Sequence, residues 1–440
     1  MSKIEEGPTM AAPDGRQAPG YRRYVDPQSR TISPAIFSDP DVYAAEQEQV
    51  FGHSWLFIGH ELQLPAVGNY ITTYMGEDGV IAVRDRAGVV RVYLNSCPHR
   101  GMKLCGLDQG TAKSFKCPYH AWTFNLQGEL IAVPGFEEGY HGELDTKDWG
   151  LIEVPRVESY HGLIFASFDE NIESLPDYLG EAKWYLDLLL DRTERGIMPF
   201  QGKNQWTYNG NWKLLAENFA GDNAHVHWTH QSIVAITGGH FDFKSDGQWT
   251  RSFLTGTSKG HAFITNSIED GALTSPGLKA HRDSVQAEAA TRLSPVQADL
   301  SNSIRLGTIF PNFGFVESFG WCALRLYLPK GPSKTEVWTW LFTEKDMPEA
   351  LLAETRGSFI QTTSNSGIVE VDDAEMWSKC QEAHSKPYRR KFPLNYQMGA
   401  GHSRRDPDRP GEIHSLPSEH GVFSLYERWV EMMDKEEGKA

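Results

Sequence analysis

The chain has 440 residues, of which 40% are hydrophobic and 12% aromatic, so it can bury a substantial core in two domains or one large one. Its net charge of −16 excludes nucleic acid as an expected partner, because a protein that neutralises phosphates needs the opposite sign. No stretch reaches the roughly 18–20 apolar residues of a membrane span, and the N-terminus is acidic without an apolar core, so we expect a cytoplasmic protein.

The first 55 residues carry few structural signals. Residues 1–35 are polar with scattered Pro and Gly, which predicts a mobile N-terminal arm. Residues 36–55 predict a helix that packs with the larger domain, because Ser38 or Asp39 is a suitable N-cap before Pro40.

The rest of the chain divides into two patterns. Residues 56–168 contain short β runs separated by Gly and charged turns, which predicts a small all-β domain with strands at 70–74, 80–83 and 89–93. In residues 169–440 helices and strands mix without strict alternation. This predicts a larger α+β domain built on an antiparallel sheet with covering helices, a helix-grip-like arrangement. We expect its helices at 178–195, 282–300 and 348–363, and its strands at 308–316, 323–328 and 336–343.

Four residues in the β-rich region have metal-binding spacing: Cys97 and His99, followed by Cys117 and His120. Two thiolates and two neutral imidazoles bind either a tetrahedral zinc or a [2Fe–2S] cluster whose second iron takes two histidines. Zinc fingers usually pair Cys with Cys and His with His along the chain. Here each of the two segments contributes one Cys and one His, which favours the cluster, with both sulfurs on one iron and both imidazoles on the other.

A second candidate site contains three histidines within six residues, His225, His227 and His230. A non-heme Fe(II) oxygenase needs two histidines, one carboxylate and open positions for O2. On an ideal helix His225 and His230 are rotated ~140° apart, so they meet one metal only where the helix is distorted or ends. The alternative is a solvated helix face, and His227 would point elsewhere.

These strings resemble the Rieske non-heme iron aromatic-ring-hydroxylating oxygenases, and the chain length is most like their large (alpha) subunits. The matching strings are Cys-Pro-His-Arg-Gly at 97–101, Cys-Pro-Tyr-His-Ala-Trp at 117–122 and Asp-x2-His-x4-His at 222–230. Upstream of the third, Asn-Gly-Asn-Trp-Lys at 209–213 and Glu-Asn at 217–218 also match. The family often has Gly where Ala121 stands.

The resemblance implies one [2Fe–2S] cluster and one Fe²⁺ per subunit. It places the iron on His225, His230 and Asp373, the second Asp of a Glu-x-Asp-Asp stretch. Spacing alone does not choose between Asp372 and Asp373. Asp222 is then expected to join His225 to a cluster histidine, His120, of a neighbouring subunit. The alternative for Asp222 is a helix cap.

The resemblance also implies the function. The chain would be the catalytic subunit of a dioxygenase that uses O2 to cis-dihydroxylate an aromatic hydrocarbon or aromatic carboxylate. Its electrons would come from NADH through a separate reductase and/or ferredoxin, because the chain has no G-x-G-x-x-G fingerprint. Seven basic and two acidic residues between 84 and 116 favour docking of an acidic ferredoxin. The expected assembly is a homotrimer or, with a small beta subunit, α3β3.

The substrate pocket is expected to include Asn218, Phe219, Asn312 and Phe313. An aromatic acid would need a basic pocket residue, for which Arg305 and Arg325 are the candidates. Two alternatives remain: a Rieske monooxygenase or O-demethylase with the same metals, and an electron-transfer Rieske protein, which would lack the second site.

Overall fold

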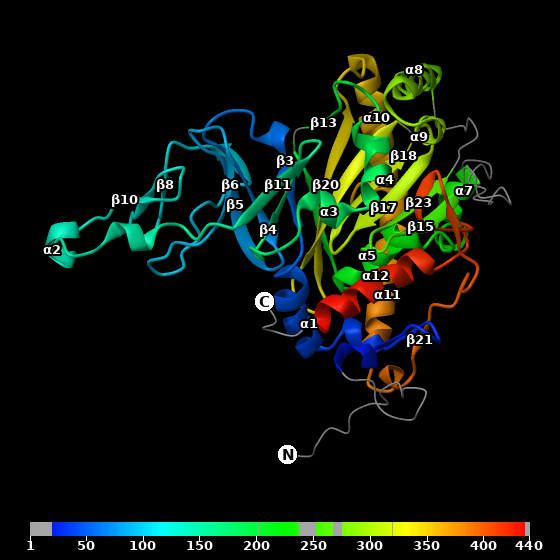
Figure 1. Cartoon of the computed structure of the whole chain (residues 1–440), viewed down its shortest axis with the longest axis horizontal. Helices are drawn as coiled ribbons and strands as arrows, with labels where there is room; N and C mark the ends of the chain where they lie inside the picture. Colours follow the sequence, from blue (N-terminus) through cyan, green and yellow to red (C-terminus); the bar gives the residue numbers. More distant parts are fainter. Residues whose placement is uncertain (1–19, 201, 237–251, 267–274, 319, 436–440) are drawn as a thin grey trace. The chain divides into compact units, whose positions relative to one another are not determined.

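The computed structural model describes residues 20–200, 202–236, 252–266, 275–318 and 320–435 (Figure 1). The chain forms two compact units, Phe51–Leu175 and a larger one of Met1–Val50 with Pro176–Ala440. The fold class is α+β as predicted, since the small unit is built on strands and the large one combines helices with an antiparallel sheet. In the described ranges, no helix is long and apolar enough to cross a membrane.

The small unit holds three antiparallel sheets, with strand orders β6-β5-β4-β7, β11-β12-β3 and β10-β9-β8. The predicted strands at 70–74, 80–83 and 89–93 are confirmed as β4, β5 and β6. Asp85 accepts hydrogen bonds from the backbone N–H groups of Ala87 and Val89, which closes the β5–β6 turn. The strand bounds are β3 Leu56–His60, β4 Asn69–Met75, β5 Asp78–Arg84, β6 Val90–Leu94, β7 Gln109–Thr111, β8 Phe115–Lys116, β9 Thr123–Phe124, β10 Leu130–Ala132, β11 Arg156–Tyr160 and β12 Leu163–Ser167.

The large unit is built on one ten-stranded antiparallel sheet. Its order is β13-β20-β19-β18-β17-β16-β15-β23-β22, and β14 also pairs with β20. The bounds are β13 Ile197–Pro199, β14 Asn204–Tyr208, β15 Phe253–Gly256, β16 Ala262–Asn266, β17 Ile304–Ile309, β18 Phe313–Ser318, β19 Trp321–Pro329, β20 Thr335–Glu344, β22 Arg404–Asp406 and β23 Arg409–His414. The prediction of one strand over 308–316 was wrong. Two strands meet there at a turn, because Pro311 has no N–H to donate to a ladder.

The helices confirm one of the three predicted ranges and divide the other two. The helix predicted at 348–363 is α10, Glu349–Thr362. The range 178–195 is broken at Gly180, whose left-handed φ of +48° no helix accepts. The range 282–300 is broken where Ser294 caps a helix that begins with Pro295. The helix bounds are α1 Pro40–Glu46, α2 Phe136–Tyr140, α3 Leu175–Leu179, α4 Ala182–Leu190, α5 Trp212–Gly221, α6 Val226–Thr229, α7 Gln231–Ile236, α8 Pro276–Arg292, α9 Pro295–Leu300, α11 Ile368–His384 and α12 His420–Met433.

The N-terminal segment is more structured than predicted. Residues 1–19 of the predicted mobile arm lie outside the described residues. From Gly20 onward the chain forms short elements, including β1 (Val25–Asp26) and β2 (Thr31–Ile32), and β2 pairs with β21 (Leu394–Asn395). Ile32 is fully buried, which anchors this segment to the large unit.

The helix predicted within 36–55 begins where Asp39 caps it, and it packs on the large unit. The buried carboxylate of Glu46 pairs with the Lys213 ammonium. It also accepts hydrogen bonds from the indoles of Trp212 and Trp429. A buried charge needs this complete set of partners, so α1 is fixed to α5 and α12.

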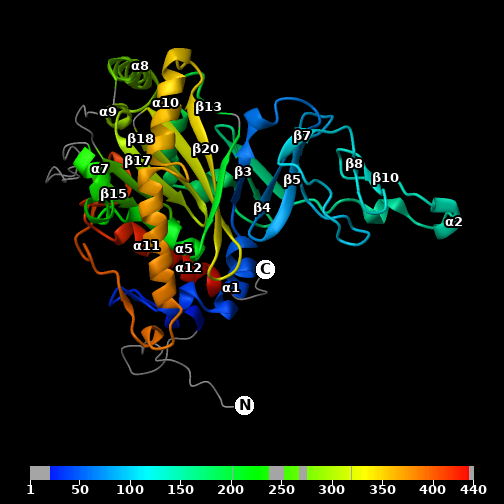
Figure 2. The ribbon, with the colours of Figure 1, turned by 180° about the vertical axis from the view of Figure 1, so that it is seen from behind.

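Two sets of helices cover the sheet of the large unit. Helix α5 packs on β16 and β17 and against α12, while α10 packs on β19 and β20. Helix α11 follows α10 along the sheet (Figure 2). The short helices α6 and α7 contact α11, and the end of α5 leads directly into them. The second predicted metal site lies at this meeting point.

Candidate metal centres

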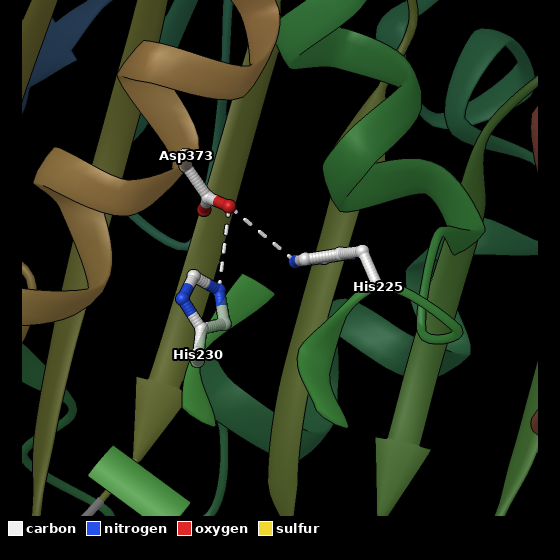
Figure 3. A group of neighbouring side chains, drawn as sticks. All are labelled: His225, His230 and Asp373. Carbon is white, nitrogen blue, oxygen red and sulfur yellow. Dashed lines mark ion pairs between the residues drawn. The ribbon is translucent and has the colours of Figure 1, made fainter. Parts of the chain in front are cut away.

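His225, His230 and Asp373 converge in the large unit (Figure 3). The Nε2 atoms of His225 and His230 lie 3.5 and 3.3 Å from the same oxygen, Oδ1 of Asp373. The two rings are 5.1 Å apart and nearly perpendicular, at 77°. Helix α6 spans only Val226–Thr229, with His225 and His230 at its two caps. Because the helix ends at His230, the two histidines are not held at the ~140° separation that an ideal helix would give them.

The two neighbouring aspartates of α11 face different atoms. Asp372 lies 3.4 Å from Nδ1 of His230, while Asp373 faces the Nε2 atoms and approaches the amide of Asn218 at 3.4 Å. Successive residues on a helix are rotated by ~100°, so both could not face the same point. Asp372 thus contacts His230 at Nδ1, the nitrogen that faces away from Asp373, and orients its ring. Sequence spacing did not reveal this contact. The side chain of His227 lies outside the described structure.

The charges around His225 change its pKa. Burial acts to lower the pKa of His225, but the nearby carboxylates of Asp222 and Asp373 outweigh it and raise the pKa to about 9. Its Nδ1 atom lies 3.5 Å from Asp222, whose side chain is 43% exposed. A metal that binds this ring therefore competes with a proton for its nitrogen.

An apolar pocket opens beside the three residues. Asn218 and Phe219, two residues expected at the substrate pocket, line it, with apolar side chains from α6, α7, α11 and the sheet: Val226, Ile233, Ile264, Ile304, Leu306, Val316, Trp321 and Val369. Its polar lining includes the carboxylates of Asp222, Glu370 and Asp373. The described residues that line it include no Lys or Arg.

The predicted pocket residues Asn312 and Phe313 do not line this pocket. On β18 it is Val316 and Ser318 that face it, and side chains alternate along a strand, so Phe313 points to the opposite face. Asn312 lies beyond the far end of β18, where its amide donates to the backbone oxygen of Tyr327 at 3.0 Å.

The two arginines considered as pocket cations are both buried in ion pairs. Arg305 pairs with Glu317, which also pairs with Arg192. Arg325 binds Glu370 through both nitrogens of its fork, at 2.5 and 3.0 Å. Neither guanidinium is therefore available to a substrate carboxylate.

The four residues of the first predicted site lie on two loops of the small unit. Cys97 and Cys117 are buried, and burial together with the neighbouring Cys117 thiol raises the pKa of Cys97. The His99 and His120 rings are 4.6 Å apart at 71°. His99 also stacks on Trp122 at 4.9 Å, which fixes its ring plane. A thiol pair and an imidazole pair fit a cluster whose irons take different ligands.

The two loops share one backbone design. The Cys97 N–H donates to the Met102 oxygen and the Cys117 N–H to the Trp122 oxygen, and each cysteine oxygen accepts from a residue four positions later. Those residues, Gly101 and Ala121, have left-handed φ angles of +70° and +60°. Glycine takes this conformation freely, whereas alanine is strained in it.

The comparisons with known proteins assign both parts of the chain to known domains. Residues 54–160 match the Rieske [2Fe-2S] domain, and residues 175–435 match the catalytic domain of the ring-hydroxylating alpha subunit. The chain belongs to the ring-hydroxylating alpha subunits. It is 37% identical to the biphenyl 2,3-dioxygenase subunit alpha of Rhodococcus jostii, over 98% of this chain and 95% of that one. To the benzene 1,2-dioxygenase subunit alpha of Pseudomonas putida it is 36% identical, over 94% of each chain.

Solved structures give the same result. A naphthalene 1,2-dioxygenase from a Rhodococcus species, bound to indole, superposes with a TM-score of 0.84 at 34% identity, over 93% of this chain and 95% of that one. As a ring-hydroxylating alpha subunit, the protein is a Rieske non-heme iron oxygenase that carries a [2Fe–2S] cluster and a mononuclear iron. An electron-transfer Rieske protein is excluded, because the catalytic domain is present.

Replacing Ala121 by glycine should stabilise the small unit. The left-handed conformation costs alanine about 1–2 kcal/mol. Glycine removes this strain, but its greater freedom in the unfolded chain offsets part of the gain, so we expect the free energy of unfolding to rise by about 1 kcal/mol. The measurement is the temperature at which the cluster absorbance disappears on heating. Gly101→Ala is the matched control and should lower this temperature, because alanine is strained at this left-handed φ. Backbone strain is then the only cause, since a methyl group there meets only Ser96 Oγ, at 3.9 Å. Equal shifts in one direction would contradict the strain argument.

Proposed function

We propose that this alpha subunit cis-dihydroxylates a neutral aromatic hydrocarbon, with iron held by His225, His230 and Asp373. The cluster is assigned to Cys97, His99, Cys117 and His120. The metals supply O2 activation and electron delivery. The residues of the chain hold the metals, exclude water and orient the substrate. The observation that carries the choice of substrate is the pairing of both candidate pocket arginines with buried glutamates.

The charges around the pocket favour a neutral ligand. An aromatic carboxylate would meet the carboxylates of Asp222 and Asp373 without a Lys or Arg among the described lining residues. Burying an unpaired carboxylate costs several kcal/mol. An aromatic hydrocarbon has no such cost and gains about 25 cal/mol for each Å² of apolar surface removed from water. The biphenyl, benzene and naphthalene dioxygenases among the relatives act on substrates of this kind by name.

Asp222 is proposed to connect the iron site with a cluster in a neighbouring subunit. Its carboxylate lies beside Nδ1 of His225 and is nearly half exposed, so an imidazole from outside the chain can reach it. A negative charge between two imidazoles holds a proton on each facing nitrogen. This role supports a trimeric ring, as α3 or as α3β3 with a small beta subunit.

The electron donors are proposed to be a ferredoxin and/or an NADH-dependent reductase. The excess of basic residues between 84 and 116 supports docking of an acidic donor on the small unit. Arg91 contributes little to it, because it is paired with Asp85 and Glu153. The other basic residues of the segment carry this proposal.

The substrate class can be tested directly. The loaded enzyme with a surrogate reductase should oxidise benzene, biphenyl or naphthalene to cis-diols that carry both atoms of labelled O2. Phthalate and terephthalate should react at least about tenfold more slowly, because one unpaired buried charge costs more than 1.4 kcal/mol. Faster turnover of the aromatic acids would refute the hydrocarbon assignment. A product with a single labelled oxygen would indicate a monooxygenase.

The ligand assignment separates the two aspartates of α11. Asp373→Ala should remove the mononuclear iron and all turnover while the Rieske absorbance stays intact, because the cluster residues belong to the other compact unit. Asp372→Ala is the control and should keep iron. It should lower iron affinity only about 10–100-fold, as expected for a residue that orients a ligand. Iron retained in Asp373→Ala and lost in Asp372→Ala would reverse the assignment.

Asp222→Asn should keep both metals but slow reoxidation of the reduced cluster when substrate and O2 are added. Asparagine is nearly isosteric, but it cannot hold a negative charge between two imidazoles. The measurement is single-turnover absorbance of the cluster. If Asp222 only capped a helix, asparagine would serve equally well, and the rate would stay within about twofold of wild type.

A further inference from the structure

A second group of metal-binding side chains lies outside the iron site, at the junction of β23 and α12. Glu412 and His414 are two residues apart on β23, so their side chains lie on the same face of the strand. His420 is the first residue of α12. One ligand atom from each residue lies within 4.8 Å of the other two. We propose that Glu412, His414 and His420 form a second metal site, which takes a divalent first-row transition ion such as Zn²⁺.

The strongest observation concerns His414. Its side chain is buried, with the residue 1% exposed, and neither ring nitrogen has a hydrogen-bond partner in the part of the chain that the structure describes. A buried imidazole that leaves both nitrogens unpaired is costly. A metal ion would give one of these nitrogens a partner, and the carboxylate of Glu412 would offset part of the charge of the ion.

The distances resemble those of the iron site. Nε2 of His420 lies 3.3 Å from Oε2 of Glu412, the separation that His230 has from Asp373. Space for His420 depends on Gly256 of β15, which pairs with Glu412. A Cβ atom at position 256 would lie 3.2 Å from Nε2 of His420 and 2.5 Å from the Ser424 hydroxyl. Glycine at this position leaves the nitrogen accessible.

Both histidines offer neutral lone pairs. Burial lowers the pKa of His414 to about 3 and that of His420 to about 4. The rings are stacked 3.9 Å apart at 24°. The ring of His414 must turn for both nitrogens to reach one ion. Because no hydrogen bond holds it among the described residues, that rotation breaks none.

Arg30 determines which ring nitrogen of His420 carries the proton. Its Nη2 donates to Nδ1 of His420 at 3.3 Å, so the proton of the ring is on Nε2, facing Glu412. When a metal binds Nε2, that proton leaves and the ring takes one proton at Nδ1, so the ring remains neutral. Arg30 then releases His420 while it stays over the ring of Phe423, 4.9 Å away. The positive charge of Arg30 opposes the ion and makes the site weaker than a site without it.

The site would connect β23 to the start of α12. Helix α12 carries Tyr426, whose hydroxyl donates to Glu217 on α5. Helix α5 ends one residue before Asp222. An ion at the junction therefore stabilises the packing on which the α5 end of the iron site depends. With three protein ligands, a water completes a tetrahedral zinc.

The test is zinc binding to the full chain loaded with cluster and iron. After dialysis against micromolar Zn²⁺, we expect about one extra zinc per chain by elemental analysis. Anomalous diffraction at the zinc edge should place it among Glu412, His414 and His420. Glu412→Gln and His420→Gln should each weaken zinc binding at least about tenfold, since each removes a ligand. Glu431→Gln changes an exposed carboxylate on the same helix and should bind zinc like wild type.

Two further measurements keep the outcome clear. His230→Ala, which disables the iron site, should still bind the zinc, which separates this site from metal exchange at the iron centre. Zinc should raise the unfolding temperature of wild type and Glu431→Gln but not that of Glu412→Gln. A variant that folds poorly is recognised by a low unfolding temperature before zinc is added. An anomalous peak elsewhere, or zinc bound equally by Glu412→Gln and His420→Gln, overturns the proposal.

Discussion

The position of the proposed iron carboxylate depends on the buried ion pair between Arg325 on β19 and Glu370 on α11. The two side chains are 0% and 3% exposed, and the pair is bidentate. Glu370 precedes Asp373 by one turn of α11, so fixing Glu370 on the sheet also fixes the rotation of the helix at Asp373. Leaving either charge unpaired would cost roughly 3–5 kcal/mol, so α11 cannot turn without a large loss of stability. The convergence of Asp373 with His225 and His230 follows from this constraint.

The same pair determines what the pocket can accept. Arg325 also donates to the Thr363 backbone and lies over Phe219, a pocket residue, at 4.7 Å. The charge of Arg325 is thus neutralised by Glu370, while the carboxylates of Asp222 and Asp373 remain beside the pocket. Arg325 therefore holds α11, the helix of the proposed iron carboxylate, in place, and because it is already paired, no free Lys or Arg lines the pocket among the described residues. The position of Asp373 and the proposed preference for a neutral substrate therefore share a physical cause, the Arg325–Glu370 pair.

The sequence predicted what is local and missed what is assembled across the sheet. The cluster strings and the His225–His230 string each lie within a few residues, so residue type and spacing revealed them. Asp373 follows His230 by more than 140 residues, and only family resemblance selected it over Asp372. The pairing of Arg325 with Glu370 has no spacing signal, so Arg325 was interpreted as a candidate pocket cation. Asn312 and Phe313 were expected at the pocket but do not line the one beside Asp373, because composition does not reveal which face of β18 a side chain takes or which end of the strand borders a pocket.

Asp222 differs from the other carboxylates of the site in exposure. Its side chain is 43% exposed, against 7% for Asp373. A carboxylate that only oriented His225 could be as buried as Glu370, which needs Arg325 to balance its charge. Burial acts to raise the pKa of Asp222, but its hydrogen bonds to His225 and the charge of that ring outweigh this and lower it, so Asp222 is ionised without an arginine partner. The same exposure leaves part of the carboxylate free for a donor from outside the chain. On this argument the proposed iron ligands and pocket come from one subunit, whereas the proposed electron route through Asp222 needs a second subunit.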